Sequence, residues 1–570
     1  MTVMWELDTP AEGAVTFLQG KGDPTVVRAP KPVVPPEGAK GALHLYAVKL
    51  TDLKPGTKYT YSVKSGNDIS KQSSFHTFPE KADTFTLIAY GDSRSHPEIH
   101  GKLAAYFDQY KPAFILHSGD MVGNGPNSDE WRKDFFAPLA SVIDHIPLFG
   151  ARGNHERKGR NMDYYLSPPD GKYFYSFDYG SAHVICLQSV SEDALAWAEK
   201  DLAATKAVWK FAFYHYPSFN IGGHAGAWGQ TTVVPILRKH KVDVTITGHS
   251  HLYERYYPLV PLKDPKAHPI THVVSGGGGA PKYGSRPHPC LASVKSISHF
   301  LVINVSPESI TIDTRDIDNK RYDICTIKKK NGVYDQEYLS AAMPEEAVII
   351  SQRLAGNQWG RLQFQASGLP SPKRTVNVDC VYSGDKLDYP VKGTITLSEG
   401  SKKNYVMEPE ELPFDLGTKA TFGLRSKSRL KVVGGGINPP LSVVYRCKVG
   451  TVELKTTKGV DLAGALHGDT TWQPLGRLTP NDRKWSYQSF AKGFKPKRMK
   501  YWTRDVPFSK RDAKWFMPTF DASGWKTGKG PIGKGQKRAC LALQCQGWQA
   551  GRSSRFLPRG AEAEDPRKAR

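Results

Sequence analysis

Five apolar runs of this 570-residue chain each end at residues whose side chains can bind a metal ion. The runs have the length and composition of buried strands. Their ends are Gly91-Asp92, Gly119-Asp120, Gly153-Asn154-His155-Glu156, His215 and Gly248-His249-Ser250-His251. Because ligands gather at the carboxyl ends of strands in α/β sheets, we expect these distant segments to converge on one small volume. Their oxygen and imidazole donors indicate a site for a hard or borderline metal ion.

The length of the chain points to several domains. A chain of 570 residues is too long for one hydrophobic core. No stretch approaches twenty consecutive apolar residues, so no transmembrane helix is predicted. No signal peptide is predicted either, because residues 1–6 have the pattern of a strand. We therefore expect that the chain begins inside a domain, with Met1 not the native start, or that it is cytosolic.

The positive charge of the chain is concentrated near its C-terminus. Residues 481–570 hold 22 Lys and Arg against 7 Asp and Glu, which is 15 of the net +23. Such a stretch can bind nucleic acid or an anionic surface. The alternative is a solvated face or a disordered end without a charged partner.

Strand-like and helix-like patterns divide the chain into regions. Short strands at regular spacing over residues 1–80 predict a β-sandwich. Strands alternate with helical spacing over 84–330, for example at 97–110 and 193–204. Strand-like sequence rich in turns returns over 340–460. We therefore expect an α/β domain with an all-β sandwich on each side.

Two of the flanking regions resemble known modules. Trp5, the run 53–63 and the segment 74–78 look like a fibronectin type III module that lacks its first strand. Residues 465–537 are similar to part of the jelly-roll, carbohydrate-binding-like domains appended to many secreted enzymes. Residues 538–570 lack strand periodicity, and we expect a basic, disordered tail there, with an out-of-frame end as a further hypothesis.

The ordered motifs at the strand ends resemble the calcineurin-like metallophosphoesterase superfamily. Within it, they are similar to the purple acid phosphatase-like branch with an N-terminal fibronectin-type domain, and the resemblance covers residues 1–330. Any one motif is weak, but five in this order are highly specific. The resemblance implies a two-sheet β-sandwich flanked by helices (αββα), and a centre of two metal ions. Asp, Asn and His ligands suit Fe, Zn and Mn alike.

The resemblance also assigns ligands to the two ions. The expected set is Asp92, Asp120, Asn154, His215, His249 and His251. Two ions about 3.5–4 Å apart repel each other, so an anionic bridge is needed between them. Asp120 can give one carboxylate oxygen to each ion. Asp92 and His251 belong to the first ion and the other three residues to the second. The neutral amide of Asn154 leaves net positive charge to attract phosphate.

Two further residues of these motifs and loops receive catalytic roles from the resemblance and from their chemistry, and a third receives an orienting role. The nucleophile is a metal-bound hydroxide, so no Ser or Cys nucleophile is needed. His155 protonates the leaving oxygen or stabilises the transition state, and Glu156 orients His155 or its loop. His224 matches a position where related enzymes often place a histidine that contacts the substrate.

Two positions depart from the family pattern. Arg94 stands two residues after Asp92, where many members have a histidine, and Gly123 stands where purple acid phosphatases have a tyrosine. The first ion then lacks one protein ligand, and water, a residue such as Asn124, or nothing takes that place. Without a tyrosinate the protein should not be purple. Because guanidinium groups bind phosphate oxygens well, we expect Arg94 to bind the substrate phosphate and to offset a weaker first metal.

These features predict a metal-dependent phosphoesterase that acts on phosphomonoesters. The family is typically exported, so a periplasmic, envelope or extracellular location is expected. One alternative is a phosphodiesterase or nuclease attracted to nucleic acid by the basic C-terminal region. Another is a degenerate site in a protein whose β-sandwiches bind polysaccharide.

Overall fold

The computed structural model describes most of the chain up to residue 460. The described residues are 1–80, 82, 84–168, 174–224, 226–354, 360–367, 375–384, 389, 391–415, 422–432, 441–460, 484–489, 526–529 and 541–545. Apart from three short strands, the predicted jelly-roll region 465–537 and tail 538–570 lie outside these residues. Those strands form a sheet of order β33-β32-β34: β32 (Lys484–Ser489), β33 (Lys526–Lys529) and β34 (Leu541–Cys545).

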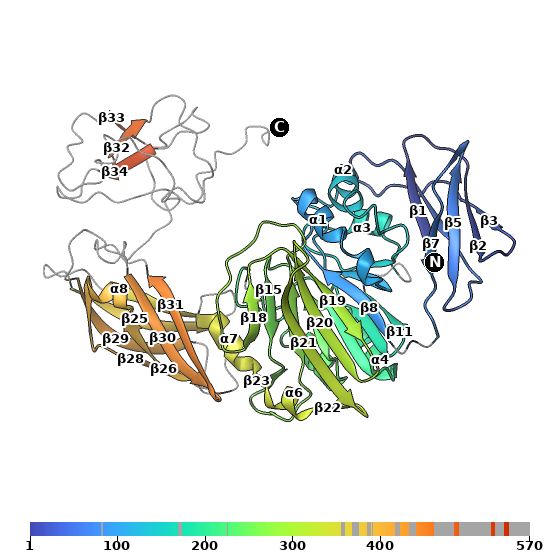
Figure 1. Cartoon of the computed structure of the whole chain (residues 1–570). Helices are drawn as coiled ribbons and strands as arrows, with labels where there is room; N and C mark the ends of the chain where they lie inside the picture. Colours follow the sequence, from blue (N-terminus) through green and yellow to red (C-terminus); the bar gives the residue numbers. More distant parts are fainter. Residues whose placement is uncertain are drawn as a thin grey trace.

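The N-terminal module consists of two small antiparallel sheets (Figure 1). One pairs β1 (Thr2–Leu7) with β4 (His44–Lys49). The other has the order β3-β2-β5-β6, with β7 also paired to β5. Its strands are β2 (Gly13–Gln19), β3 (Thr25–Arg28), β5 (Lys58–Ser65), β6 (Asp68–Ile69) and β7 (Ser73–His76). Val3, Phe17 and Phe75 belong to the core of this module. Its assignment as fibronectin type III stays a prediction.

Two seven-stranded sheets form the central module. The first has the order β10-β9-β8-β19-β20-β21-β22. Its strands are β8 (Phe85–Tyr90), β9 (Phe114–His117), β10 (Leu148–Gly150), β19 (His299–Val305), β20 (Ser309–Asp316), β21 (Arg321–Lys330) and β22 (Val333–Tyr334). The second has the order β11-β12-β13-β14-β17-β15-β18. Its strands are β11 (Tyr175–Tyr179), β12 (Ala182–Cys186), β13 (Trp209–Tyr214), β14 (Val244–Thr247), β15 (Tyr253–Tyr256), β17 (Thr271–Ser275) and β18 (Leu291–Lys295).

The central strands are buried on both faces, which explains their unbroken apolar sequences. Successive side chains of a strand point to opposite faces. In β8, Leu87 belongs to the core shared by the two sheets, and Ile88 belongs to the core on the outer face. In β13, Phe211 lies in the shared core and Ala212 in the second outer core. Each outer face must therefore be covered by another layer.

Short helices cover these two outer faces (Figure 1). The first sheet is covered by α1 (Pro97–Ala104), η1 (Asp108–Tyr110), α2 (Ser128–Glu130), the π-helical turn η2 (Trp131–Phe136) and α3 (Arg160–Tyr165). The second is covered by α4 (Glu192–Ala204) and α5 (Val233–Lys239). The helical pattern over 97–110 is thus divided between α1 and η1. The predicted two-sheet sandwich flanked by helices is confirmed.

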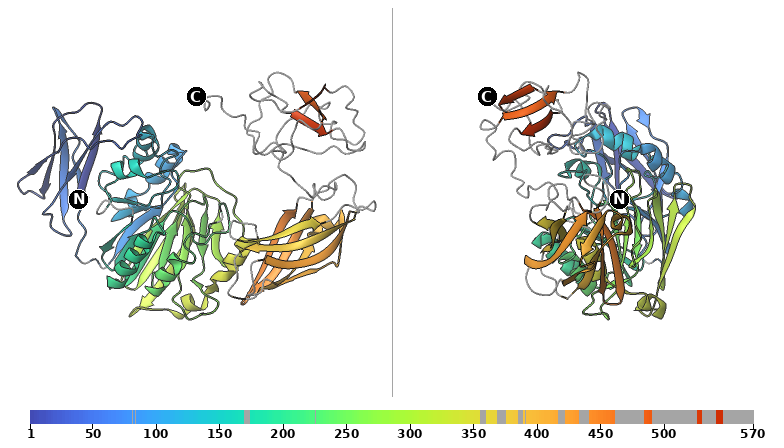
Figure 2. Two further views of the ribbon diagram at one scale, coloured as in Figure 1. Left: turned by 180° about the vertical axis from the view of Figure 1, so that it is seen from behind. Right: turned by 90° about the vertical axis from the view of Figure 1, so that its left-hand side faces the viewer.

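A buried helix leads from the central module to a C-terminal β-sandwich. After α6 (Gln336–Ser340), β23 (Met343–Pro344) pairs with β16 (Leu259–Val260), and α7 (Glu345–Leu354) follows directly. Figures 1 and 2 show α7 between the central sheets and the sandwich. One sandwich sheet is β24 (Gly360–Ser367), β25 (Thr375–Gly384), β29 (Phe422–Val432) and β27 (Tyr405–Glu408). The other is β28 (Leu412–Asp415), β26 (Lys392–Leu397), β30 (Leu441–Val449) and β31 (Val452–Val460), and α8 (Glu399–Lys402) follows β26.

None of the helices in the described part of the chain combines the length and the apolar character that a bilayer requires.

Candidate metal centre

The structure brings the ends of the five apolar runs together. β8, β9 and β10 are parallel neighbours in one sheet, and β13 and β14 are parallel neighbours in the other. The carboxyl ends of parallel strands meet at one edge of a sheet. Ligand atoms of Asp92, Asp120 and His215 consequently lie within 4.8 Å of one another, and all three side chains are buried.

Three candidate ligands have a left-handed backbone conformation. The φ angle is 58° at Asp92, 56° at Asp120 and 64° at His249. Residues other than glycine adopt this region at a cost of about 1–3 kcal/mol. Each of these residues follows shortly after a strand that the rest of the sheet holds in place. The surrounding fold therefore keeps the three turns in a conformation that the isolated chain would avoid.

Glycines allow the turns to approach one another closely. A Cβ atom at Gly119 would lie 2.8 Å from the backbone nitrogen of Gly153 and 2.9 Å from Nδ1 of His215. A Cβ atom at Gly153 would overlap Oδ1 of Asp120 and lie 2.5 Å from its backbone nitrogen. Real Cβ atoms do not approach neighbours so closely, so both positions require glycine.

The polar atoms of the side chains expected to hold the second ion lie close to one another. Nδ1 of His215 lies 2.9 Å from the carbonyl oxygen of Ser118, which can only accept a hydrogen bond. In a neutral imidazole, Nε2 of His215 then carries a lone pair. This atom lies 3.1 Å from Oδ1 of Asn154 and 3.4 Å from Oδ1 of Asp120. Nδ1 of His249 lies 3.0 Å from the same amide oxygen.

The residues expected at the first ion show the same arrangement. Nδ1 of His251 lies 2.7 Å from the carbonyl oxygen of Pro281, which leaves Nε2 with a lone pair 3.4 Å from Oδ1 of Asp92. Oδ2 of Asp92 accepts a hydrogen bond of 2.8 Å from the backbone N–H of His249. Oδ1 of Asp92 is buried and has no hydrogen-bond partner among the described residues.

These donors fit a cation well. A buried carboxylate oxygen without a partner is costly unless a positive charge compensates it. Imidazoles whose second nitrogen is bound to a carbonyl are typical metal ligands. Burial lowers the pKa of His249 to about 3, so its imidazole is neutral near pH 7, which is the form that binds metals.

The guanidinium group of Arg94 lies against two of the candidate ligands. Nε of Arg94 is 3.4 Å from Oδ2 of Asp120, and Nη2 is 3.3 Å from Nε2 of His251. Nη1 donates to the hydroxyl of Ser95 at 3.2 Å. Arg94 therefore lies on the side of the site where the first ion is expected.

His155 and Glu156 contact different parts of the site. Nδ1 of His155 lies 2.6 Å from the carbonyl oxygen of Gly123, and Nε2 lies 3.8 Å from Oδ2 of Asp120. The buried Glu156 carboxylate accepts backbone hydrogen bonds from Asp120 at 2.9 Å, Met121 at 2.8 Å and Gly153 at 2.6 Å. Burial, followed by the charge of Asp120, raises the pKa of Glu156 to about 7. Glu156 thus connects the loops after β9 and β10.

His224 lies beside the candidate ligands through ring contacts. Its ring stacks on His249 with 5.1 Å between centroids, and Nε2 lies 2.8 Å from the hydroxyl oxygen of Tyr283. The ring of Tyr283 stacks on His251 at 4.2 Å. Tyr216 also faces His249, with 4.6 Å between ring centroids. Neither tyrosine could be predicted from the sequence, because both lie in loops without periodicity or motif.

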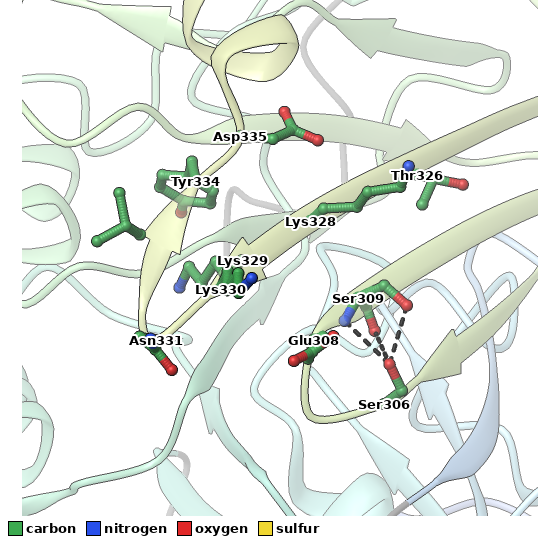
Figure 3. Close-up of a pocket in the computed structure, with 11 residues that line it drawn as sticks. Ser306, Glu308, Ser309, Thr326, Lys328, Lys329, Lys330, Asn331, Tyr334 and Asp335 are labelled. Atoms are coloured by element: carbon green, nitrogen blue, oxygen red, sulfur yellow. Dashed lines mark hydrogen bonds between the residues drawn. The ribbon is translucent and has the colours of Figure 1, made fainter.

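A separate surface hollow lies at the other end of the first sheet. Its volume is about 840 Å³, and its lining includes Lys328, Lys330 and Tyr334 (Figure 3). It lies near the end of β19, where Val305 pairs with Phe85 at the amino end of β8. None of the candidate ligands lines this hollow, so it is distinct from the metal centre.

Comparison with known proteins agrees with this geometry. A family model described as calcineurin-like phosphoesterase matches residues 82–253. Acid phosphatase type 7 of Mus musculus is 24% identical over 330 residues, which covers 49% of this chain and 75% of that protein. A purple acid phosphatase of Glycine max is 28% identical over 287 residues, covering 42% of this chain and 61% of that protein.

A solved structure shows the same fold. The purple acid phosphatase PPD1 from yellow lupin seeds matches with a TM-score of 0.51 at 19% identity, over 60% of this chain and 73% of that chain. The matched family region contains all six candidate ligands.

Replacement of Gly153 by alanine tests the close approach of the loops. We expect Gly153→Ala to lose most of its bound metal, because the new Cβ atom displaces Asp120. Gly284→Ala is the matched control, since a Cβ atom there meets nothing within 4 Å. Elemental analysis of both purified variants measures the metal content. Wild-type metal content in Gly153→Ala would contradict the close approach.

Glu254 should make stability depend on pH. Its buried carboxylate accepts backbone hydrogen bonds from Ile221 and Gly222. Burial outweighs these bonds and raises the pKa of Glu254 to about 7 from an ordinary value of 4.5. The folded state then binds more protons than the unfolded state between these pH values, so this group lowers stability as pH rises.

Glu254→Gln removes that ionisation. Relative to wild type, the free energy of unfolding of the variant should increase as pH rises from 5 to 7, which means that the variant becomes the more stable protein. Urea unfolding of both proteins in excess chelator, at several pH values, measures this difference. Parallel curves for the two proteins would show that Glu254 has an ordinary pKa.

Proposed function

We infer that this chain, whose residues 82–253 form a calcineurin-like phosphoesterase domain, is a metal-dependent phosphoric ester hydrolase that acts on phosphomonoesters. One observation carries this inference. In that domain, Nε2 of His215 lies 3.1 Å from Oδ1 of Asn154 and 3.4 Å from Oδ1 of Asp120, so three atoms with lone pairs converge. Such a group of acceptors is stable when a cation lies among them.

Purple acid phosphatase-like metallophosphoesterases use a binuclear metal centre. We propose that Asn154, His215 and His249 hold one ion, that Asp92 and His251 hold the other, and that Asp120 bridges them. The lone pair of Asp92 Oδ1 and the carbonyl-bound imidazoles support this assignment. When bound, the ions supply the positive charge that holds phosphoryl oxygens and lowers the pKa of a water nucleophile.

His155 is proposed as the proton donor to the leaving oxygen. Nδ1–H of His155 donates a hydrogen bond to the carbonyl oxygen of Gly123, so the imidazolium form carries its second proton on Nε2. Nε2 is the nitrogen near Asp120, with 3.8 Å between the two side chains. His155 can then donate the Nε2 proton to the alkoxide that leaves phosphorus.

Arg94 and His224 are proposed to contact the substrate. Arg94 places a permanent positive charge beside Asp120 and His251, where a phosphoryl oxygen could accept from its guanidinium group. His224 stacks over His249 and is exposed, so it can contact the ester group that leaves. Together the two side chains would bind opposite parts of a phosphomonoester.

We also propose export of the protein and an anionic or polysaccharide partner for its C-terminal region. The resemblance to a typically exported family supports the first proposal. The concentration of Lys and Arg after residue 480 supports the second.

Asn154→Ala tests the metal assignment and the activity together. We expect roughly a 100-fold or larger loss of phosphomonoester hydrolysis, with lower metal content, because the variant lacks the amide oxygen. Asn304→Ala, at an exposed position of β19, is the control. p-Nitrophenyl phosphate and bis(p-nitrophenyl) phosphate are the two substrates. A wild type that hydrolyses only the diester would replace our proposal with a phosphodiesterase, and a wild type without metal or turnover would favour a degenerate site.

Arg94→Ala tests the contact with phosphate. The KM for p-nitrophenyl phosphate should rise about tenfold or more, because a charge-assisted hydrogen bond is lost. Arg94→Lys should recover part of the loss, since it keeps the charge but not the fork of donors. The inhibition constant of inorganic phosphate should rise in parallel. Unchanged KM and turnover in Arg94→Ala would remove this role.

A further inference from the structure

Helix α7 contacts the loop that carries His224, although it lies more than 120 residues later in the chain. Ser351 and Gln352 of α7 are buried polar residues, with 4% and 5% of their surfaces exposed. Buried polar side chains at a helix surface need hydrogen-bond partners. Both residues find them in loops next to the candidate metal centre, and the proposed mechanism uses neither residue.

Gln352 bridges the two ends of the turn that presents His224. Its Nε2 donates to the carbonyl oxygen of Asn220 at 2.9 Å and to that of Gly226 at 2.7 Å. These carbonyls belong to the residues four before and two after His224. Oε1 of Gln352 accepts from Nε2 of Gln230 at 3.1 Å. Because both bridged atoms are acceptors, only the amide nitrogen of Gln352 can face them.

The same turn is held from inside by Asn220. Nδ2 of Asn220 donates to the carbonyl oxygens of Gly222 at 2.7 Å and of His224 at 2.8 Å. Oδ1 of Asn220 accepts from the backbone N–H of Gly226. Asn220 therefore shapes the turn, and Gln352 connects the shaped turn to α7.

α7 also reaches the loop that carries Tyr283. Nδ1 of His288 accepts from the backbone N–H of Cys290 at 3.1 Å, so the imidazole proton is on Nε2. That nitrogen lies 2.7 Å from the hydroxyl oxygen of Ser351. Tyr283 and His224 are themselves joined by a contact of 2.8 Å. Two neighbouring residues of α7, Ser351 and Gln352, thus contact the loop that carries Tyr283 and the loop that carries His224.

Other residues of α7 contact the C-terminal β-sandwich. Val348 and Ile350 of α7 belong to one buried cluster with Ile395 and Tyr445 of the sandwich. Phe219, which lies in the His224 loop, belongs to the same cluster. Figures 1 and 2 show α7 at this junction. The loop, the helix and the sandwich therefore share a continuous core.

We propose that Gln352 is a positioning residue for His224, and that α7 thereby ties the C-terminal β-sandwich to the substrate side of the metal centre. This inference rests on the proposed function, because it assigns a purpose to the position of His224. It gives the sandwich a role in substrate binding without direct contact to the substrate.

Gln352→Met tests this proposal, because methionine keeps the length and volume of the side chain but cannot donate. The KM for p-nitrophenyl phosphate should rise about tenfold, with turnover and metal content changed less than about twofold. Gln336→Met, at an exposed position of α6, is the matched control and should behave as wild type. An unchanged KM in Gln352→Met would overturn the proposal.

A double-mutant cycle separates positioning from a general structural effect. If Gln352 acts through His224, then Gln352→Met should add nothing to the defect of His224→Ala. If the two changes in KM multiply, Gln352 does not act through His224 and the proposal is wrong.

Hydrogen–deuterium exchange of the full chain gives a result that does not depend on activity. The amides of residues 216–224 should exchange several-fold faster in Gln352→Met than in wild type, while those of β19 should not change. If wild type hydrolyses no ester, the proposed function fails, and this measurement alone decides whether α7 holds the loop. Equal exchange over 216–224 in both proteins would show that it does not.

Discussion

Three turns in a left-handed backbone conformation hold the candidate metal centre together. Asp92, Asp120 and His249 adopt φ angles of 56–64°, each just beyond the carboxyl end of a buried strand. Such turns are unfavourable alone, so they depend on the sheets that fix both of their ends. Glu156 adds a buried carboxylate that binds backbone N–H groups of two loops at once. The rigid two-sheet core thus fixes the positions of a few side chains.

The position of these side chains brings electronegative atoms together in a way that requires a compensating positive charge. Carboxylate, amide and imidazole acceptors face one another in a buried volume, and Oδ1 of Asp92 lacks a hydrogen-bond partner among the described residues. The guanidinium group of Arg94 supplies part of the compensating positive charge, because it contacts Asp120 and His251. Bound metal ions would compensate the remaining acceptors. Without positive charge this arrangement of acceptors is unfavourable. With bound cations it attracts a phosphate ester.

Much of the fold and part of the site follow from the sequence for identifiable physical reasons. Strands buried on both faces appear as unbroken apolar runs, and the confirmed two-sheet architecture follows from their alternation with helices. The metal ligands stay a prediction, although the structure brings three of them within 4.8 Å. Tyr283 and Gln352 could not be predicted from the sequence. Only the tertiary packing brings the ring of Tyr283 against His251, and only the packing brings Gln352, from a helix distant in sequence, against the loop that carries His224. The contact of Arg94 with two ligands also required the structure.

Anomalous X-ray diffraction from crystals of the full chain grown with Mn²⁺ or Zn²⁺ tests the central claim most directly. Our account predicts two peaks about 3.5–4 Å apart, with a carboxylate oxygen of Asp120 about 2.0–2.2 Å from each. One peak should also contact His215 and Asn154, and the other Asp92. Crystals without anomalous density among these side chains, or with metal only elsewhere, would contradict the account.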